Sequence, residues 1–350
     1  MQYLKESQAQ LPSVAVIIPF YNGASWIERA IKSVLAQSIQ PDEFIIVNDG
    51  SSTEQRNMLG IFAEKYPFKI IDKTNGGQGS ARNAGVAASK SDFISLLDQD
   101  DFYLPNHIKD LLSILPDDDP RLGYVYADLC EADEGGNIIC SNMLQRLSAK
   151  HPKRGHVAQL LADDMFVLPS ASLILRSAFE AVSGFDEQFT GYEDDDLFLR
   201  LFRAGYTNYF LDKPVTVWCI HSASTSWSVK MSRSRFRYFK KLLQLYPDEP
   251  KRQLYYFKDC LMPRFGREIL LDALRATKNN SKDREEISQI LNDYVNIVAR
   301  HPDVRKLKKI KLKVAALVLT KMSPAAVRVL SFMVRRLAFT RLLAVKVLRG

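Results

Sequence analysis

Hydrophobic residues in the first hundred positions fall into short runs, separated by stretches with helical periodicity. The runs are bounded by turn residues and predict strands at residues 14–19, 43–47, 68–71 and 92–97. The stretches between them predict helices at residues 25–37, 53–66 and 81–89. Ser25 and Glu28 have the spacing of a capping box, so we expect them to begin the first of these helices.

Alternating strands and helices with short connections predict an α/β fold, with a mainly parallel sheet and helices on both faces. In such sheets ligands bind at the carboxyl ends of the strands. Polar or glycine-rich segments follow the predicted strands, at residues 19–22, 48–52, 76–83 and 98–101. We therefore expect these four segments to meet at one crevice.

Three aspartates crowd the end of the fourth predicted strand: Asp98, Asp100 and Asp101. Because their charges repel one another, they require either a solvated turn or a cation. Alternate residues of an extended segment point to the same side, which brings Asp98 and Asp100 together. Carboxylate oxygens suit hard divalent cations such as Mg²⁺ and Mn²⁺. We interpret Asp98 and Asp100 as a cation site and assign Asp101 to the turn; an ordinary acidic turn is the alternative.

The glycine-rich loop at residues 76–79 precedes a helix and Arg82. It is neither a dinucleotide fingerprint nor a P-loop, because Arg82 stands where the third glycine belongs and no G-K-[ST] follows. Alone it indicates a flexible turn, but a helix N-terminus beside an arginine also suits a diphosphate. Asp49 is likewise either a turn residue or a contact to a base or ribose, and Tyr21 either a packed aromatic or a stacking platform.

Residues 183–206 predict a loop followed by a helix that Gly205 ends. Four acids begin this helix: Glu193, Asp194, Asp195 and Asp196. The helix macrodipole explains some of them but not four, so one could face the crevice as a general base. His221 follows another apolar, strand-like run, and a solitary histidine is more often structural than a ligand.

Charge is distributed unevenly along the 350 residues, whose net charge is +8. Residues 304–350 contain 13 Lys or Arg and no acid, whereas residues 1–303 carry 35 basic and 40 acidic side chains. Four cysteines without metal-ligand spacing favour a reduced, cytosolic protein. Residues 1–13 are too polar for a signal peptide, and no run of 18 apolar residues occurs, so we expect no transmembrane helix.

The basic tail also has helical apolar spacing. One stripe consists of Leu307, Ile310, Val314 and Leu317, and a second of Val329, Leu330, Met333 and Leu337. Basic residues surround the first stripe and fall on another side of the second. Three interpretations are open: an appendage or oligomerisation helix pair, an anionic membrane surface, and non-specific nucleic-acid binding. We favour the membrane surface and expect no specific nucleic acid.

Taken in order, these motifs resemble glycosyltransferase family 2 with its GT-A nucleotide-sugar fold. The resemblance runs over some 210 residues, through residues 14–37, 43–52, 75–105 and 184–201 to His221. It implies a GT-A catalytic domain at residues 13–232. A short tail at residues 1–12 precedes this domain, and a helical extension at residues 233–303 and the basic tail at residues 304–350 follow it.

The resemblance also implies residue roles. Asp49 would contact the base or ribose, with Tyr21 packing beside the base. Asp98 and Asp100 match the D-x-D motif, with Asp100 the preferred direct metal ligand, and His221 would lie near metal and diphosphate. Arg82 would approach the diphosphate, Asp194 would be the catalytic base and Glu193 its acceptor-side neighbour, although the acidic triple leaves the base open by one position. Nucleotide contacts are also expected from Pro19, Gly79 and Gln99.

The implied reaction is metal-dependent, inverting transfer of a sugar to a hydroxyl of a glycan or lipid-linked acceptor. The donor would be a nucleotide sugar, UDP-linked on family grounds, and the cation Mn²⁺ or Mg²⁺. We expect a role in bacterial surface polysaccharide synthesis, at the inner face of the cell membrane. One alternative is a non-catalytic nucleotide-sugar-binding scaffold at the membrane. Another, a sugar-phosphate nucleotidyltransferase, would carry a glycine-rich signature directly after the first strand, where this chain has residues 19–25. The sequence does not specify the sugar, acceptor, linkage or oligomeric state.

Overall fold

A computed structural model describes residues 11–147, 151, 155–221 and 228–329. The chain forms two compact units. The sheet unit comprises Met1–Gly155 and Asp164–Ser224, and the helical unit comprises His156–Asp163 and Thr225–Gly350. The division of the sequence at residues 12, 232 and 303 stays a prediction.

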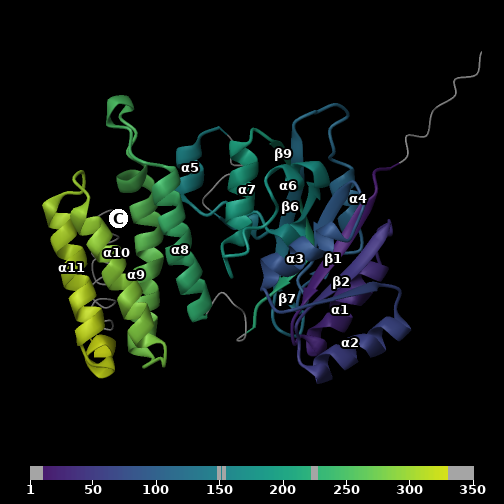
Figure 1. Ribbon diagram of the computed structural model, residues 1–350, viewed down its shortest axis with the longest axis horizontal. Helices are drawn as coiled ribbons and strands as arrows, with labels where there is room; N and C mark the ends of the chain where they lie inside the picture. Colours follow the sequence, from purple (N-terminus) through teal and green to yellow (C-terminus); the bar gives the residue numbers. More distant parts are fainter. Residues whose placement is uncertain (1–10, 148–150, 152–154, 222–227, 330–350) are drawn as a thin grey trace, which may run out of the picture. The chain divides into compact units, whose positions relative to one another are not determined.

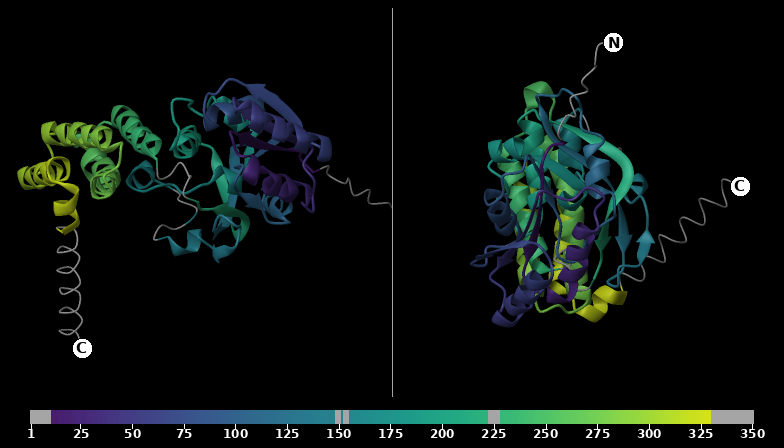
Figure 2. Two further views of the ribbon diagram at one scale, coloured as in Figure 1. Left: turned by 90° about the horizontal axis from the view of Figure 1, so that it is seen from below. Right: turned by 90° about the vertical axis from the view of Figure 1, so that its right-hand side faces the viewer.

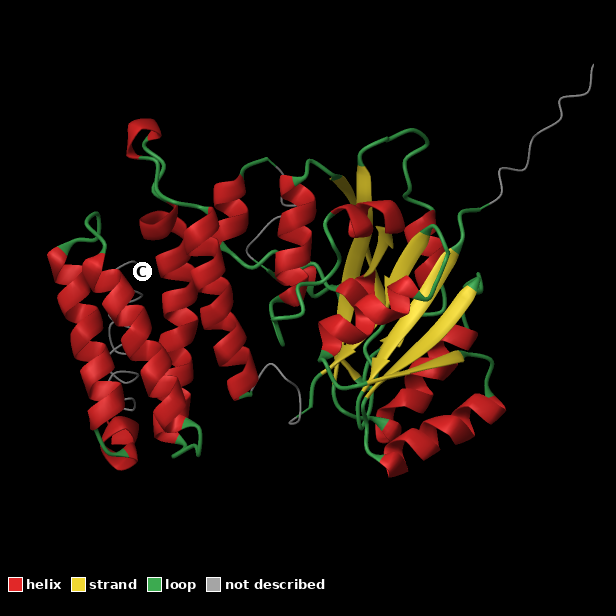
Figure 3. Cartoon of the chain, in the orientation of Figure 1, coloured by secondary structure: helices red, strands yellow, loops and turns green. Residues whose placement is uncertain are grey.

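The sheet unit is built on a mixed sheet, drawn in yellow in Figure 3. Its strands are β1 Val14–Phe20, β2 Glu43–Asp49, β3 Lys69–Lys73, β4 Phe93–Leu96, β5 Phe102–Tyr103, β6 Leu122–Ala132, β7 Ile138–Cys140, β8 Ser172–Leu175 and β9 Thr207–Cys219. Their order is β3-β2-β1-β4-β8-β6-β9-β5, with β7 on β6. The first four strands in this order are parallel, as is the pair β6–β9, and β8 is antiparallel to both β4 and β6.

Helices cover both faces of this sheet (Figure 1). They are α1 Ala24–Leu35, α2 Thr53–Lys65, α3 Gln78–Ala87, α4 His107–Leu112, α6 Arg176–Ala181 and α7 Glu193–Arg203; 3₁₀ turns occur at Leu144–Arg146 and Pro169–Ala171. Alternation along β1 separates two layers: Val16 and Ile18 pack in one core with α1 and α4, whereas Ile17 faces α3. The prediction of an α/β fold with helices on both faces is confirmed.

The first four predicted strands and three predicted helices are present, with ends shifted by up to three residues. The capping box predicted for the first helix is wrong. Gly23 is the N-cap of α1, and no side chain caps it. Glu28 instead accepts hydrogen bonds from Lys65 and Tyr66 and forms an ion pair with Lys32 at 3.2 Å. Contacts with Lys32 of the same helix and with the end of α2 therefore take the place of the predicted cap.

Apart from an isolated antiparallel bridge between Glu249 and Leu254, the helical unit consists of helices and turns among its described residues. They are α5 Val157–Ala162, α8 Val229–Leu245, a 3₁₀ turn at Pro250–Arg252, a π-turn at Phe257–Leu261, α9 Met262–Lys278, α10 Arg284–Arg300 and α11 Lys306–Lys321. Helices α8–α11 pack side by side as a bundle (Figure 2). Its core is aromatic: Phe239 packs on Phe265 and Tyr294, whose hydroxyl donates to the Met262 carbonyl at 2.8 Å.

Helix α11 buries only one side. Ala316 and Leu319 are buried, and Thr277 of α9 donates to the Leu319 carbonyl at 2.8 Å. The predicted stripe at residues 307, 310, 314 and 317 is 55–62% exposed. The second predicted stripe lies outside the described residues apart from Val329. Across the described residues, no helix combines the length and apolar character required of a membrane-spanning segment.

Candidate active site

Hydrogen bonds tie together the ends of β1, β2 and β4, as the parallel topology predicts. Asn22 and the turn after β2 exchange bonds: Asn22 N–H donates to Ser51 Oγ at 3.0 Å, and Ser52 N–H to Asn22 Oδ1 at 2.9 Å. Gln99 Oε1 accepts from Tyr21 N–H at 2.9 Å, while Tyr21 itself is 48% exposed. A Cβ on Gly23 would overlap the Gln99 side chain. Gln99 thus fixes the β1 end and leaves the Tyr21 ring open to a ligand.

Asp49 lies at the end of β2 and is only 3% exposed. Its Oδ1 accepts from Lys73 Nζ at 2.7 Å and Gly76 N–H at 2.9 Å, and its Oδ2 accepts from Gly77 N–H at 2.8 Å. Asp49 therefore anchors the glycine-rich loop, a role that sequence reasoning missed. The parallel register, which pairs Asp49 with Lys73, carried the signal. Contact of Asp49 with a base or ribose stays a prediction.

Arg82 joins the D-x-D segment to the start of α7. Its Nη2 donates to Asp98 Oδ1 at 2.6 Å, and its Nη1 donates to Glu193 Oε1 at 3.2 Å. The Arg82 side chain is 3% exposed and lies over the Phe185 ring at 5.2 Å. Gln78 also donates to Asp98 Oδ1, at 2.6 Å. Residues more than 90 positions apart in sequence, Asp98 and Glu193, are thereby brought to one guanidinium.

Burial raises the pKa values of the first two acids of α7, Glu193 and Asp194. It raises the pKa of Glu193, an effect that Arg82 partly offsets. Glu193 Oε2 is buried and accepts no hydrogen bond from the described residues, so a ligand hydroxyl could satisfy it. Burial, followed by the charges of Glu193 and Asp164, raises the pKa of Asp194 well above its usual range. A perturbed carboxyl in this position is typical of acid–base sites.

The two acids after Asp194 have structural partners. Asp195 Oδ1 accepts from Met165 N–H at 3.0 Å. Asp196 Oδ2 accepts from Arg200 Nε at 2.8 Å, and Arg200 reaches on to the Val182 and Gly184 carbonyls. Within the described part of the chain, the Asp194 side chain accepts one hydrogen bond, a local one from Asp195 N–H at 2.8 Å. These contacts favour Asp194 over its neighbours as the acid available to a substrate.

Asp100 and His221 form the third part of the site. His221 Nε2 lies 2.6 Å from Asp100 Oδ2, and its ring stacks on Trp26 with centroids 4.7 Å apart. Burial, followed by the charge of Asp98, raises the pKa of Asp100. The carboxylate suits Mn²⁺ or Mg²⁺ when water and diphosphate oxygens complete the shell, whereas an imidazole is a ligand more typical of transition metals than of Mg²⁺. Among the described residues, the ligand atoms of Asp98, Asp100 and His221 do not all lie within 4.8 Å of one another.

The D-x-D segment is held in place by further buried groups. Asp101 lies in the turn, as predicted, but is buried; its Oδ1 accepts from Cys219 N–H at 2.9 Å. Arg29 of α1 donates to the Asp100 carbonyl at 2.6 Å. Sequence reasoning missed Arg29, Gln78, Trp26 and Arg200, because their contacts are set by the tertiary fold and not by a local motif.

Pro19 and Gly79, also predicted to contact the nucleotide, occupy tightly packed positions near these groups. Pro19 is buried near the end of β1 and opposite Val47 in register. Gly79 is buried in α3, where an added Cβ would lie 3.3 Å from Phe185 Cβ. Their direct contact with a nucleotide stays a prediction, and the absence of a side chain at Gly79 leaves room for Phe185 and Glu193 beside α3.

The sheet order and helix layers define the GT-A class of transferase fold. Two solved structures share it. S. aureus TarS 1–349 in complex with UDP-GlcNAc has a TM-score of 0.59 at 16% identity, over 88% of this chain and 89% of that chain. Mannosyltransferase PcManGT from Pyrobaculum calidifontis in complex with GDP-Man and Mn²⁺ has a TM-score of 0.53 at 17% identity, over 93% and 84%. At these identities the similarity shows the fold alone.

Residues 15–183 match the family described as Glycosyl transferase family 2. These residues therefore carry a domain similar to this family of transferases, as the sequence motifs indicated. An uncharacterized glycosyltransferase of Rickettsia prowazekii is 33% identical over 218 residues, which cover 61% of this chain and 66% of that protein. The chain thus spans just under two thirds of this relative's length.

Proposed function

We propose that this protein transfers a sugar from a nucleotide-diphospho-sugar to an acceptor hydroxyl, with inversion at the anomeric carbon. Asp194 is the general base and Glu193 binds the acceptor. The observation that carries the proposal is the Arg82 bridge, because one buried guanidinium contacts both Asp98 of the D-x-D segment and Glu193 beside Asp194. Donor-side and acceptor-side groups therefore share one site.

The chemistry follows from these side chains. An acceptor hydroxyl loses its proton as the new C–O bond forms, and the raised pKa of Asp194 makes it a stronger base than an ordinary carboxylate. Glu193 Oε2, buried and unpaired among the described residues, can accept from another acceptor hydroxyl. Arg82 supplies positive charge where the departing diphosphate becomes more negative. Attack from the face opposite the nucleotide, in one displacement, inverts the anomeric centre.

Asp100 and His221 are the residues that would hold Mn²⁺ or Mg²⁺, and Asp98 is bonded through Oδ1 to Gln78 and Arg82. When bound, the cation would neutralise charge on the diphosphate. Asp49 and Gln99 order the loop and strand end around the nucleotide, and Tyr21 offers an exposed ring for its base. We propose a UDP-sugar as donor and a glycan or lipid-linked molecule as acceptor.

A screen of nucleotide sugars for Mn²⁺-dependent hydrolysis tests this function. We expect one donor to be hydrolysed, and the activity to be lost in Asp100→Ala while the fold is kept. Binding of a nucleotide sugar without turnover under any acceptor or metal condition would favour the alternative, a non-catalytic scaffold. The joint presence of Asp98, Asp100, Arg82 and Asp194 in one bonded arrangement argues against that alternative.

The exposed face of α11 supports a peripheral position on an anionic membrane. Leu307, Ile310, Val314 and Leu317 are 55–62% exposed on one side of the helix. Exposed lysines flank them at positions 306, 311 and 313. Apolar residues bordered by lysines suit the headgroup boundary of an anionic leaflet, where each basic residue adds about 1 kcal/mol. A lipid-linked acceptor in bacterial surface polysaccharide synthesis would be reached from this position at the inner face of the membrane.

A further inference from the structure

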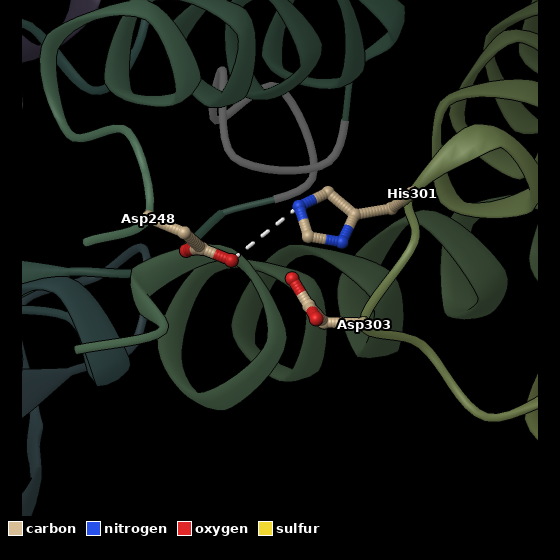
Figure 4. A group of neighbouring side chains, drawn as sticks. All are labelled: Asp248, His301 and Asp303. Carbon is tan, nitrogen blue, oxygen red and sulfur yellow. Dashed lines mark ion pairs between the residues drawn. The ribbon is translucent and has the colours of Figure 1, made fainter. Parts of the chain in front are cut away.

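Three potential metal ligands converge in the helical unit, whereas the groups proposed for sugar transfer belong to the sheet unit. Asp248 belongs to the segment after α8, and His301 and Asp303 belong to the connection between α10 and α11. One ligand atom from each residue lies within 4.8 Å of the other two. Figure 4 shows the three side chains pointing toward one another.

The Asp248 carboxylate is fixed through one oxygen, and its other oxygen has no hydrogen bond from the described residues. Its Oδ1 accepts from Phe257 N–H at 2.8 Å, which fixes the side chain. The side chain is 9% exposed, and Oδ2 is buried without a hydrogen bond from the described residues. His301 Nε2 lies 3.4 Å from this oxygen, which is long for a hydrogen bond. A buried carboxylate oxygen in this situation lacks a partner that offsets its desolvation.

The geometry points to a site for a zinc-type divalent cation formed by Asp248, His301 and Asp303. In tetrahedral coordination, with ligand bonds of about 2.0–2.2 Å, two ligand atoms lie about 3.4 Å apart, as Asp248 Oδ2 and His301 Nε2 do. The His301 ring is already oriented, because it stacks on Phe257 at 4.1 Å and 15°. Asp303 is exposed and free to rotate inward, and water can take the fourth position.

Such a site would be structural. It would fasten the start of α11, through His301 and Asp303, to the segment that leads from α8 toward α9. Two carboxylates and a neutral imidazole together balance the charge of one divalent cation. A bound cation would therefore stabilise the folded state in proportion to its occupancy, as any ligand specific to the native state does.

The full-length chain carrying Asp100→Ala, which disables the cation site of the D-x-D segment, isolates this second site. After EDTA treatment we expect it to take up one Zn²⁺ per chain by elemental analysis and titration calorimetry, with a rise in Tm. Adding Asp303→Asn, at an exposed residue, should weaken Zn²⁺ binding about tenfold or more and remove the Tm rise.

Asp259→Asn in the same background is the matched control, because Asp259 is an exposed acid of the same unit outside the cluster. Zinc uptake equal to that of the Asp100→Ala parent is expected for this control. The proposal is overturned if the parent binds no stoichiometric Zn²⁺, or if Asp303→Asn and Asp259→Asn bind it equally well. Neither outcome bears on sugar transfer, which the hydrolysis screen tests separately.

Discussion

At the scale of single residues, Arg82 organises the candidate site. Its guanidinium is buried between Asp98 and Glu193, so each partner loses its counter-charge if Arg82 is removed. Breaking a buried ion pair leaves an uncompensated charge in a medium of low polarity. Arg82 is therefore expected to matter for folding as well as for catalysis.

We predict that Arg82→Met lowers the free energy of unfolding by about 3–5 kcal/mol, measured by urea denaturation. The double variant Arg82→Met/Glu193→Gln should recover part of this loss, because it removes one of the stranded carboxylates. Arg252→Met, which breaks an exposed pair with Glu249, is the control and should cost about 0–1 kcal/mol. A change no larger for Arg82→Met than for Arg252→Met would contradict the bridge.

Asp194 should make stability depend on pH with a defined sign. Burial raises its pKa well above the usual value, so the native state binds more protons than the unfolded state between the two pKa values. Stability therefore falls as pH rises through that window, and the cost is fully present above the native pKa. Asp194→Asn removes the cost of ionising this carboxyl in the folded state. We therefore expect the variant to unfold at higher temperature than the wild type at pH 7, by about 2–4 °C for each kcal/mol gained in the free energy of unfolding.

Thermal unfolding between pH 5 and pH 8 checks this expectation, which also includes a shallower pH dependence for the variant. The control is Asp133→Asn, because hydrogen bonds from Asn137 lower the pKa of Asp133, so its replacement should bring no gain at pH 7. A wild type that is as stable as Asp194→Asn at pH 7 would show that the folded state does not raise the pKa of Asp194.

Sequence reasoning identified several residues that the fold brings into contact, but not the contacts themselves. The D-x-D segment, Arg82 and the acids of α7 carry recognisable patterns, and Asp98, Arg82 and Glu193 are bonded in the structure. The roles of Gln78, Trp26 and Arg200 carry no local pattern, because each depends on an element distant in sequence. The role of Asp49 as anchor of the glycine-rich loop follows from strand register, which residue types alone do not specify.

At the scale of elements, α3 positions Arg82 through close packing on the sheet. An added Cβ at Gly85 would lie 2.4 Å from Ile17 Cγ2 and 3.1 Å from Val47 Cγ2. The helix can approach β1 and β2 this closely only because residue 85 has no side chain. The glycine-rich loop and Arg82 are thereby kept at the strand ends.

We predict that Gly85→Ala lowers the free energy of unfolding by about 1–3 kcal/mol, through overpacking against β1. Gly60→Ala in α2 is the matched control, because the nearest atom there, Arg56 Nη1, is 3.5 Å away. That substitution should stabilise the protein by about 0.5–1 kcal/mol, since alanine favours a helix interior. Urea denaturation of both variants measures these changes. Equal changes in the free energy of unfolding would contradict the packing argument.

Some helices and strands could be predicted from the sequence and others could not. Helix α10 occupies residues 284–300, within the helical extension predicted at residues 233–303, because one apolar stripe repeats without interruption. The pairing of β6 with β8 and β9 was not foreseen. It joins strands about 50–85 residues apart. The mixed strand directions and the register shifts along β6 and β9 cannot be predicted from local periodicity.

At the scale of the whole molecule, charge is segregated along the chain. The basic residues of the tail are gathered from residue 304 onward without a single acid, while the preceding 303 residues are net acidic. The described part of the tail includes α11, whose apolar stripe lies exposed among lysines. This arrangement favours an anionic surface as partner of the tail.

We predict that the full chain floats with phosphatidylglycerol vesicles and not with phosphatidylcholine vesicles. Ile310→Glu/Leu317→Glu should abolish flotation, because the substitutions put acids into the exposed apolar face. Salt at about 0.5 M should weaken binding by screening the lysines. Ile61→Glu, at a 55% exposed position of α2, is the control and should float normally. If Ile310→Glu/Leu317→Glu floats as well as Ile61→Glu, the exposed face of α11 does not bind the membrane.

The central claim is that Asp194 is the base of a sugar transfer in this site, and turnover of Asp194→Asn tests it most directly. With the donor found in the screen, we predict nucleotide-sugar affinity near that of the wild type and turnover lowered by about 10²-fold or more. Asp195→Asn keeps an oxygen for Met165 N–H and should retain turnover within about tenfold. Near-normal turnover of Asp194→Asn, or loss of turnover in Asp195→Asn alone, would contradict the assignment.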